Sequence, residues 1–148
     1  MALRRSKTYR LAKKKAWKWF SYYIRLRDCV NQCHIPTSAC FGFCFTCGNV
    51  TFFNEAHAGH FISGRGNAVL FTEKGSHLQC ASCNVGRDGE QPKYTLKMIE
   101  RYGKEVTEQE MALRYKIVKF TQDDLEEIAQ KYHDKYEALK GGRLKNGQ

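Results

Sequence analysis

The pattern of apolar and polar residues predicts a long helix near the start of the chain. Trp17, Phe20 and Ile24 recur at helical spacing between lysines and arginines, so we expect a basic amphipathic helix over residues 8–28. We expect these three side chains to pack against the core, and the alternative is that they stack on bases. The opposite, basic face is then available to backbone phosphates.

The second half of the chain has three further helical patterns. One begins near Pro92, which suits a first helical turn, and is expected to close at Gly103. Another covers residues 107–118, and a third starts at Thr121 as its N-cap and is expected to stop at the glycine pair 141–142. The apolar stripe of this last helix either forms a homodimer interface or completes the monomer core: Leu125, Ile128, Tyr132, Tyr136 and Leu139.

The middle of the chain shows short strand signals between loops. We expect a loop over residues 29–43, and then a cysteine knuckle and a β-hairpin over residues 44–62. Residues 50–53 have strand propensity, and residues 60–62 are expected to end the second strand. The glycine-rich residues 63–76 read as an exposed loop.

Four of the seven cysteines form two CxxC pairs, Cys44 with Cys47 and Cys80 with Cys83. This spacing points two sulfurs of each pair at one ion and is typical of a tetrahedral, structural Zn²⁺ site. The metal would close the long loop between the pairs and contribute to folding.

The other three cysteines lie upstream of the first pair. We expect Cys29, Cys33 and Cys40 to be buried free thiols. The alternative is a second metal site that uses Cys29, Cys33 and the adjacent His34, although a fourth ligand is not evident.

Composition narrows the class of protein. The chain of 148 residues carries 25 Lys and Arg against 15 Asp and Glu, a formal net charge of +10 that fits a nucleic acid partner. An odd cysteine count and a charged start over residues 1–7 argue against a secreted disulfide framework, so we expect a cytoplasmic protein. No apolar stretch is long enough to cross a membrane.

A histidine and an asparagine next to the knuckles suggest hydrolytic chemistry. His60 lies between the two CxxC pairs, and Asn84 directly follows the second. Hydrolysis of a phosphodiester needs a base to activate water and a cation to stabilise the developing charge. We expect His60 to be the base and Asn84 to be a ligand of Mg²⁺ or Mn²⁺ through its side-chain oxygen.

The order CxxC, histidine, CxxC-Asn resembles that of the HNH nucleases (ββα-metal, His-Me finger), including phage endonuclease VII. The chain resembles the phage NinG/Rap family more closely, over about residues 17 to 105. The strings that carry this resemblance are Tyr23-Ile24-Arg25-Leu26-Arg27-Asp28, Cys44-x2-Cys47-Gly48, Ala58-Gly59-His60-Phe61, His77-x-Gln79-Cys80-x2-Cys83-Asn84 and Arg101-Tyr102-Gly103.

The resemblance implies an α+β fold with a zinc-stapled ββα-metal core and flanking helices. It implies three segments: a basic tail and helix over residues 1–28, the core over 29–105, and a helical segment over 106–148. The implied activity is a metal-dependent endonuclease that cuts branched DNA such as Holliday junctions, in a phage protein of the bacterial host cytoplasm.

Two positions depart from the HNH pattern. HNH nucleases usually carry an acidic residue or histidine directly before the base, where this chain has Gly59. On a strand, His57 shares a face with Gly59, so it is the expected substitute ligand, with Glu55 as the runner-up. The middle asparagine that braces the finger is replaced by Gly75, and we expect His77 nearby to be structural.

Five basic residues are expected to contact DNA: Arg65, Arg87, Lys13, Lys14 and Arg25. Three other functions remain open. One is an HNH endonuclease that nicks or cuts duplex DNA without branch preference. The second is a zinc-stabilised DNA-binding module without catalysis, and the third is a zinc-containing scaffold in a recombination assembly.

Overall fold

The computed structural model describes residues 6–30, 37–64 and 66–145, with residues 142–145 described as backbone only. Its helices and strands follow in this order: α1 (Lys7–Arg27), η1 (Thr37–Ala39), β1 (Phe41–Phe43), β2 (Val50–Phe52), β3 (His57–His60), α2 (Asn67–Leu70), β4 (Ser76–Gln79), η2 (Ser82–Gly86), α3 (Gln91–Ala112), η3 (Leu113–Tyr115) and α4 (Gln122–Lys145).

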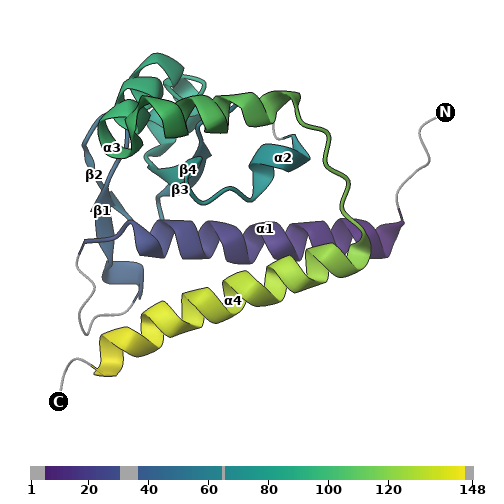
Figure 1. Cartoon of the computed structure of the whole chain (residues 1–148). Coiled ribbons are helices and arrows are strands. Elements are labelled where there is room, and N and C mark those ends of the chain that lie inside the picture. Colours follow the sequence, from purple (N-terminus) through teal and green to yellow (C-terminus); the bar gives the residue numbers. More distant parts are fainter. Residues whose placement is uncertain (1–5, 31–36, 65, 146–148) are drawn as a thin grey trace.

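The mixed α and β fold has two long helices on one side and a third on the other. In Figure 1, α4 runs beside α1, and α3 lies across the strands from this pair. The strands and the short α2 occupy the space between them. In the part of the chain that is described, no helix combines the length and apolar character needed to cross a membrane.

The predicted N-terminal helix is confirmed as α1. Ser6 caps it, because its hydroxyl accepts a hydrogen bond from the amide of Tyr9 at 3.1 Å. Phe20 and Ile24 are fully buried, as expected. Trp17 is only partly buried, and its ring packs at the edge of the core beside Phe20.

The C-terminal helix α4 completes the core of the monomer. Thr121 and Asp124 form a reciprocal cap, with each side chain accepting from the other's backbone amide. Leu125 and Ala129 then pack against the alanines of α1, so the apolar stripe is covered within the chain. The predicted stop at residues 141–142 is wrong: α4 continues to Lys145, since helical hydrogen bonding tolerates glycine at a modest cost.

The strands pair differently from the predicted hairpin. β1, which lies in the expected loop 29–43, pairs antiparallel with β2 and brackets the first cysteine pair. β3 pairs with β4, with His57 opposite Gln79 and His60 opposite Ser76. The expected loop 63–76 contains α2, whose Val69 and Leu70 are buried. Residues 61–75 separate β3 from β4, which explains why local patterns missed this pairing.

The predicted helix boundary at Gly103 is a kink. Gly103 has φ +83°, a conformation that glycine adopts without strain, and helical structure resumes directly after it to Ala112. The expected helix over residues 107–118 therefore begins earlier and ends at η3. Residues 116–121 are not regular and lead into α4.

Candidate functional site

The two CxxC pairs meet in one compact cluster. The Sγ atoms of its four cysteines all lie within 4.8 Å of one another: Cys44, Cys47, Cys80 and Cys83. The sulfurs of Cys47 and Cys80 are 3.8 Å apart, close to the roughly 3.8 Å that a tetrahedron with Zn–S bonds of about 2.3 Å requires. The cluster can therefore hold a metal ion such as zinc.

The pKa values of two thiols in the cluster shift in opposite directions. Burial opposes ionisation of Cys44, but hydrogen bonds from Thr46 and from backbone amides outweigh it and lower the pKa of Cys44 to about 6. Burial and the adjacent thiols of Cys44 and Cys83 raise the pKa of Cys47 to about 12. Four thiolates this close together need a neutralising metal ion.

Of the three cysteines outside the cluster, the structure describes Cys29 and Cys40. Cys29 and Cys40 are buried thiols outside any disulfide, as expected, and the Cys29 thiol donates to the carbonyl of Arg25 at 3.2 Å. Cys33 and His34 lie outside the described residues, so the alternative of a second metal site there stays a prediction.

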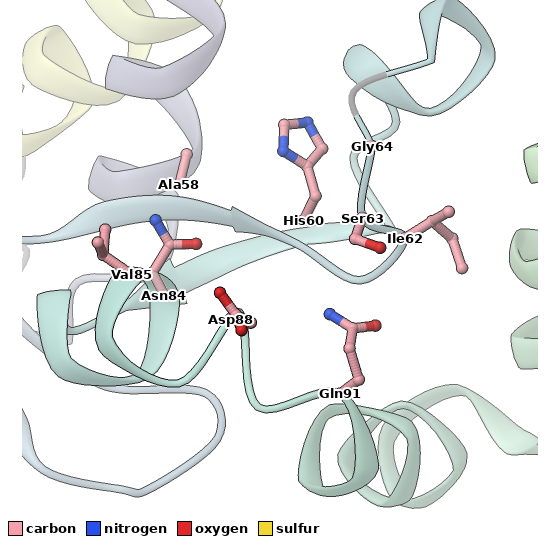
Figure 2. Close-up of a pocket in the computed structure, with 10 residues that line it drawn as sticks. Ala58, His60, Ile62, Ser63, Gly64, Asn84, Val85, Asp88 and Gln91 are labelled. Atoms are coloured by element: carbon pink, nitrogen blue, oxygen red, sulfur yellow. The ribbon is translucent and has the colours of Figure 1, made fainter.

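Beside the cysteine cluster, β3, η2 and the start of α3 surround a cleft of about 330 Å³. All four of His60, Asn84, Asp88 and Gln91 line it, and Figure 2 shows the His60 ring pointing away from Asp88 and Gln91, on the other side of the strands. Asn84 follows Cys83 directly, so the cluster fixes where η2 begins relative to β3. The structure thus brings the two principal predicted residues, His60 and Asn84, to one cleft.

His60 is oriented by two neighbours. Its Nε2 lies 3.0 Å from the carbonyl oxygen of Leu70, which can only accept, so Nε2 carries the hydrogen. The indole of Trp17 stacks on the imidazole at 5.1 Å between ring centres. In the neutral ring, Nδ1 of His60 then holds the lone pair, so Nδ1 is the atom that can take up a proton.

His57 contacts Asn84. The Asn84 amide donates from Nδ2 to Nδ1 of His57 at 2.9 Å. This bond leaves Oδ1 of Asn84 on the other side of the amide, and Figure 2 shows that oxygen turned toward the cleft. His57 therefore positions the oxygen of Asn84. Glu55, the runner-up ligand, is exposed on the turn before β3 and is not among the residues that line the cleft.

Asp88 is an acidic cleft residue that our sequence reasoning missed. It follows η2 with φ +48°, in a turn that Asp adopts more readily than most residues, and it lines the cleft four residues after Asn84. The oxygens of Asn84 and Asp88 are hard donors of the kind that Mg²⁺ and Mn²⁺ prefer. These two residues could contribute oxygen ligands to a divalent ion in the cleft. The only sequence signal was the Asp-Gly turn after the second knuckle.

The position before His60 has no room for the acidic residue of the HNH pattern. A Cβ at Gly59 would lie 1.9 Å from Oε1 of Gln79. Gln79 is fully buried, and its Nε2 donates to Thr46 and to the carbonyl of Gly89. The Gln79 side chain therefore occupies the space next to Gly59, and any acidic ligand must come from elsewhere in the fold.

A buried chain of hydrogen bonds braces the strand at this point. The hydroxyl of Tyr94 donates to the carbonyl of Gly59 at 2.8 Å and accepts from Nδ1 of His77 at 3.1 Å. Tyr102 donates to Nε2 of His77 at 2.8 Å, and Phe45 stacks on the imidazole at 3.9 Å. Burial lowers the pKa of His77 to about 3, so the ring is neutral and structural, as expected. Tyr94 and His77 thus brace β3 against α3.

The five predicted DNA contacts have different surroundings. Lys14 is exposed on α1, and Lys13 donates to Oδ1 of Asn67 at 2.9 Å. Arg87 is exposed and paired with Glu90 at 3.3 Å. Arg65 lies outside the described residues.

Arg25, the fifth expected DNA contact, makes several contacts within the chain. Its guanidinium donates to the carbonyls of Ser21, Phe53 and Ala56. It also lies over the ring of Tyr22, with 4.9 Å between the guanidinium carbon and the ring centre. This side chain ties α1 to the turn before β3.

Comparison with known proteins supports the resemblance to phage proteins. Protein ninG of Escherichia phage 933W and its counterpart in Enterobacteria phage VT2-Sa are each 28% identical over 101 residues, which cover 68% of this chain and 49% of theirs. Protein ninG of Escherichia phage lambda is 27% identical over 101 residues, 68% of this chain and 48% of that protein. The chain thus matches about half the length of these relatives. No solved structure gives a significant match.

The family comparison covers nearly the whole chain. The profile described as Bacteriophage Lambda NinG protein matches residues 2–141. The match includes both cysteine pairs, His60 and Asn84. The chain therefore belongs to the NinG family.

Proposed function

We propose that the chain is a metal-dependent DNA endonuclease that hydrolyses phosphodiester bonds in branched recombination intermediates such as Holliday junctions. One observation carries the proposal: His60, Asn84 and Asp88 line a single cleft beside the four-cysteine cluster. The antiparallel pair of β3 and β4 followed by the helical turn η2 is compatible with a ββα-metal finger. We assign a structural Zn²⁺ to the cysteines.

His60 is the general base in this proposal. Its Nδ1 accepts a proton from water as the water oxygen bonds to phosphorus, and the bond from phosphorus to the leaving oxygen breaks. The Leu70 carbonyl accepts from Nε2 and so favours the protonated imidazole that results. The leaving oxygen then takes a proton from solvent.

Asn84 and Asp88 would hold Mg²⁺ or Mn²⁺ through their side-chain oxygens. When bound, the ion supplies positive charge that stabilises the phosphorane-like charge and the leaving oxygen. His57 keeps the Asn84 amide in the orientation this role needs. The net charge of +10 supports a polyanionic substrate.

The test is cleavage of a labelled four-way junction beside a linear duplex of matched sequence, with Mg²⁺, with Mn²⁺ and with no added divalent ion. We expect metal-dependent cutting that is faster on the junction. Equal cutting of both substrates would support an endonuclease without branch preference. Binding without cutting under every metal condition would support a non-catalytic zinc module and would overturn the proposal.

A further inference from the structure

A groove with an aromatic floor runs along α1 next to the cleft. Its volume is about 370 Å³, and its lining residues come from α1 and α2: Arg10, Lys13, Lys14, Trp17 and Leu70. The α1 members follow the i, i+3, i+4, i+7 spacing of one helix face. We call this feature the Trp17 groove.

The Trp17 groove adjoins the general base of the proposed reaction. The indole of Trp17 stacks on the ring of His60, with 22° between the planes, and the carbonyl of Leu70 accepts from His60. His60 itself lines the cleft. His60 therefore lies between the Trp17 groove and the cleft, so a DNA strand that crosses His60 enters both.

The groove combines an apolar floor with a cationic rim. Leu70 is 5% exposed, and the partly buried Trp17 lines the groove with it. Arg10 and Lys14 are exposed at the rim, while Lys13 is held in place by Asn67 of α2. No acidic side chain is among the described residues that line it. The site is built for a flat apolar group attached to a negative charge.

A nucleotide has this chemistry. Its base offers a flat face that stacks on an aromatic ring whatever the sequence, and its phosphates match lysine and arginine. In a paired duplex both faces of a base are already covered by neighbouring base pairs. An unpaired nucleotide exposes a face to Trp17, and such nucleotides occur at branches where single-stranded DNA joins a duplex.

We infer that the Trp17 groove binds an unpaired nucleotide of DNA adjacent to the phosphate that lies in the cleft. The inference rests on the proposed function and deepens it, because it gives a physical basis for choosing branched over linear DNA. Trp17 is then a specificity residue, with Lys14 and Arg10 as phosphate contacts about one and two turns before it on α1.

The first experiment measures binding without added Mg²⁺ or Mn²⁺, so that no cutting occurs. A DNA with one unpaired nucleotide is compared with a fully paired duplex of the same length. We expect Trp17→Leu to weaken binding of the first about tenfold and of the second less than twofold. The matched control is Trp19→Phe, because Trp19 packs on Tyr22 and Tyr136 away from His60.

A second measurement detects stacking directly in the unaltered protein, so it does not depend on how Trp17→Leu affects folding. The unpaired nucleotide is replaced with the fluorescent analogue 2-aminopurine, whose emission falls when it stacks on an aromatic ring. With the unaltered protein we expect quenching on binding at the unpaired position and none at a paired position. Trp17→Phe keeps an aromatic ring in place and is expected to retain part of the quenching.

The outcomes separate this inference from the proposed function. Equal weakening of both DNAs by Trp17→Leu, or binding without any quenching, overturns the inference, since the groove would then hold only duplex backbone. Metal-dependent cutting in that case would leave the proposed endonuclease intact. Failure to bind any DNA overturns both.

Discussion

At position 88 the backbone takes up φ +48°, and the aspartate that it carries lines the cleft with Asn84. Glu55 is an acidic residue closer to His60 in sequence, but it is exposed and outside the lining of the cleft. At the scale of single residues, the fold therefore favours Asp88 over Glu55 as the acidic residue of the cleft, although Glu55 is nearer to His60 in sequence.

Asp88→Asn tests this assignment, because it removes the charge and keeps the size. We expect the Mg²⁺ concentration for half-maximal cleavage to rise on the order of 10- to 100-fold, as is typical when a metal site loses a supporting group. Binding of Mn²⁺, followed by its paramagnetic resonance, should weaken in parallel. Glu55→Gln is the matched control and is expected to change neither. Normal Mn²⁺ binding by Asp88→Asn would remove this residue from the site.

His77 predicts how stability depends on pH. Burial keeps its native pKa at about 3, whereas an unfolded histidine has a pKa of about 6.5. Between these values the unfolded chain binds a proton that the native chain does not. The free energy of unfolding should therefore fall as the pH is lowered below about 6.5, by about 1.4 kcal/mol per pH unit from this group.

Urea unfolding at pH values from about 7 to 5, with zinc content checked at each, measures this slope. His77→Gln should be less steep than the parent protein over that range, and His133→Gln, a change at a partly exposed histidine on α4, should not. Identical slopes for His77→Gln and the parent would mean that His77 is not the group that titrates on unfolding.

At the scale of elements, the cysteine cluster ties β4 and η2 to the turn between β1 and β2. These elements are short: the two-stranded sheets have only three or four residues per strand. Strands of this length are marginal on their own, so a metal cross-link is expected to contribute much of their stability.

Cys80→Ser and Cys40→Ser form a matched pair for this cross-link. Both remove one thiol, but only Cys80 is in the cluster. We expect one zinc per chain in the parent and in Cys40→Ser, and less than one in Cys80→Ser, with a lower melting temperature. Elemental analysis of the purified proteins gives the metal content. Full zinc occupancy in Cys80→Ser would contradict the four-cysteine site.

The sequence predicted features that depend on local spacing and missed those that depend on long-range contacts. Helical periodicity located α1, and the two CxxC pairs located the cluster, because each pattern lies within one segment. The pairing of β3 with β4 and the burial of α2 arise from partners elsewhere in the chain. Asp88 was missed for the same reason, since the cleft exists only once β3 and η2 are brought together.

At the scale of the whole molecule, the net charge of +10 favours binding to a polyanion such as DNA. Each lysine that neutralises a phosphate adds to the salt dependence of binding, through release of counterions. Lys14, exposed on α1 beside the Trp17 groove, is expected to be one such residue.

Lys14→Gln should weaken DNA binding and reduce the magnitude of the slope of log K against log salt by about 1. Lys97→Gln is the control, because Lys97 lies on α3 and pairs with Glu100 at 3.0 Å. The slopes follow from binding titrations at several salt concentrations. An unchanged slope for Lys14→Gln would place the DNA on another face.

The measurement that tests the central claim most directly is single-turnover cleavage of a labelled four-way junction by the parent and by His60→Ala. Both are assayed at saturating protein with Mg²⁺, and binding is measured separately. Loss of a general base should slow cleavage by about 10²- to 10⁴-fold while junction binding and zinc content persist. Cleavage by His60→Ala at the parental rate would contradict the assignment of His60 and of the cleft that it lines.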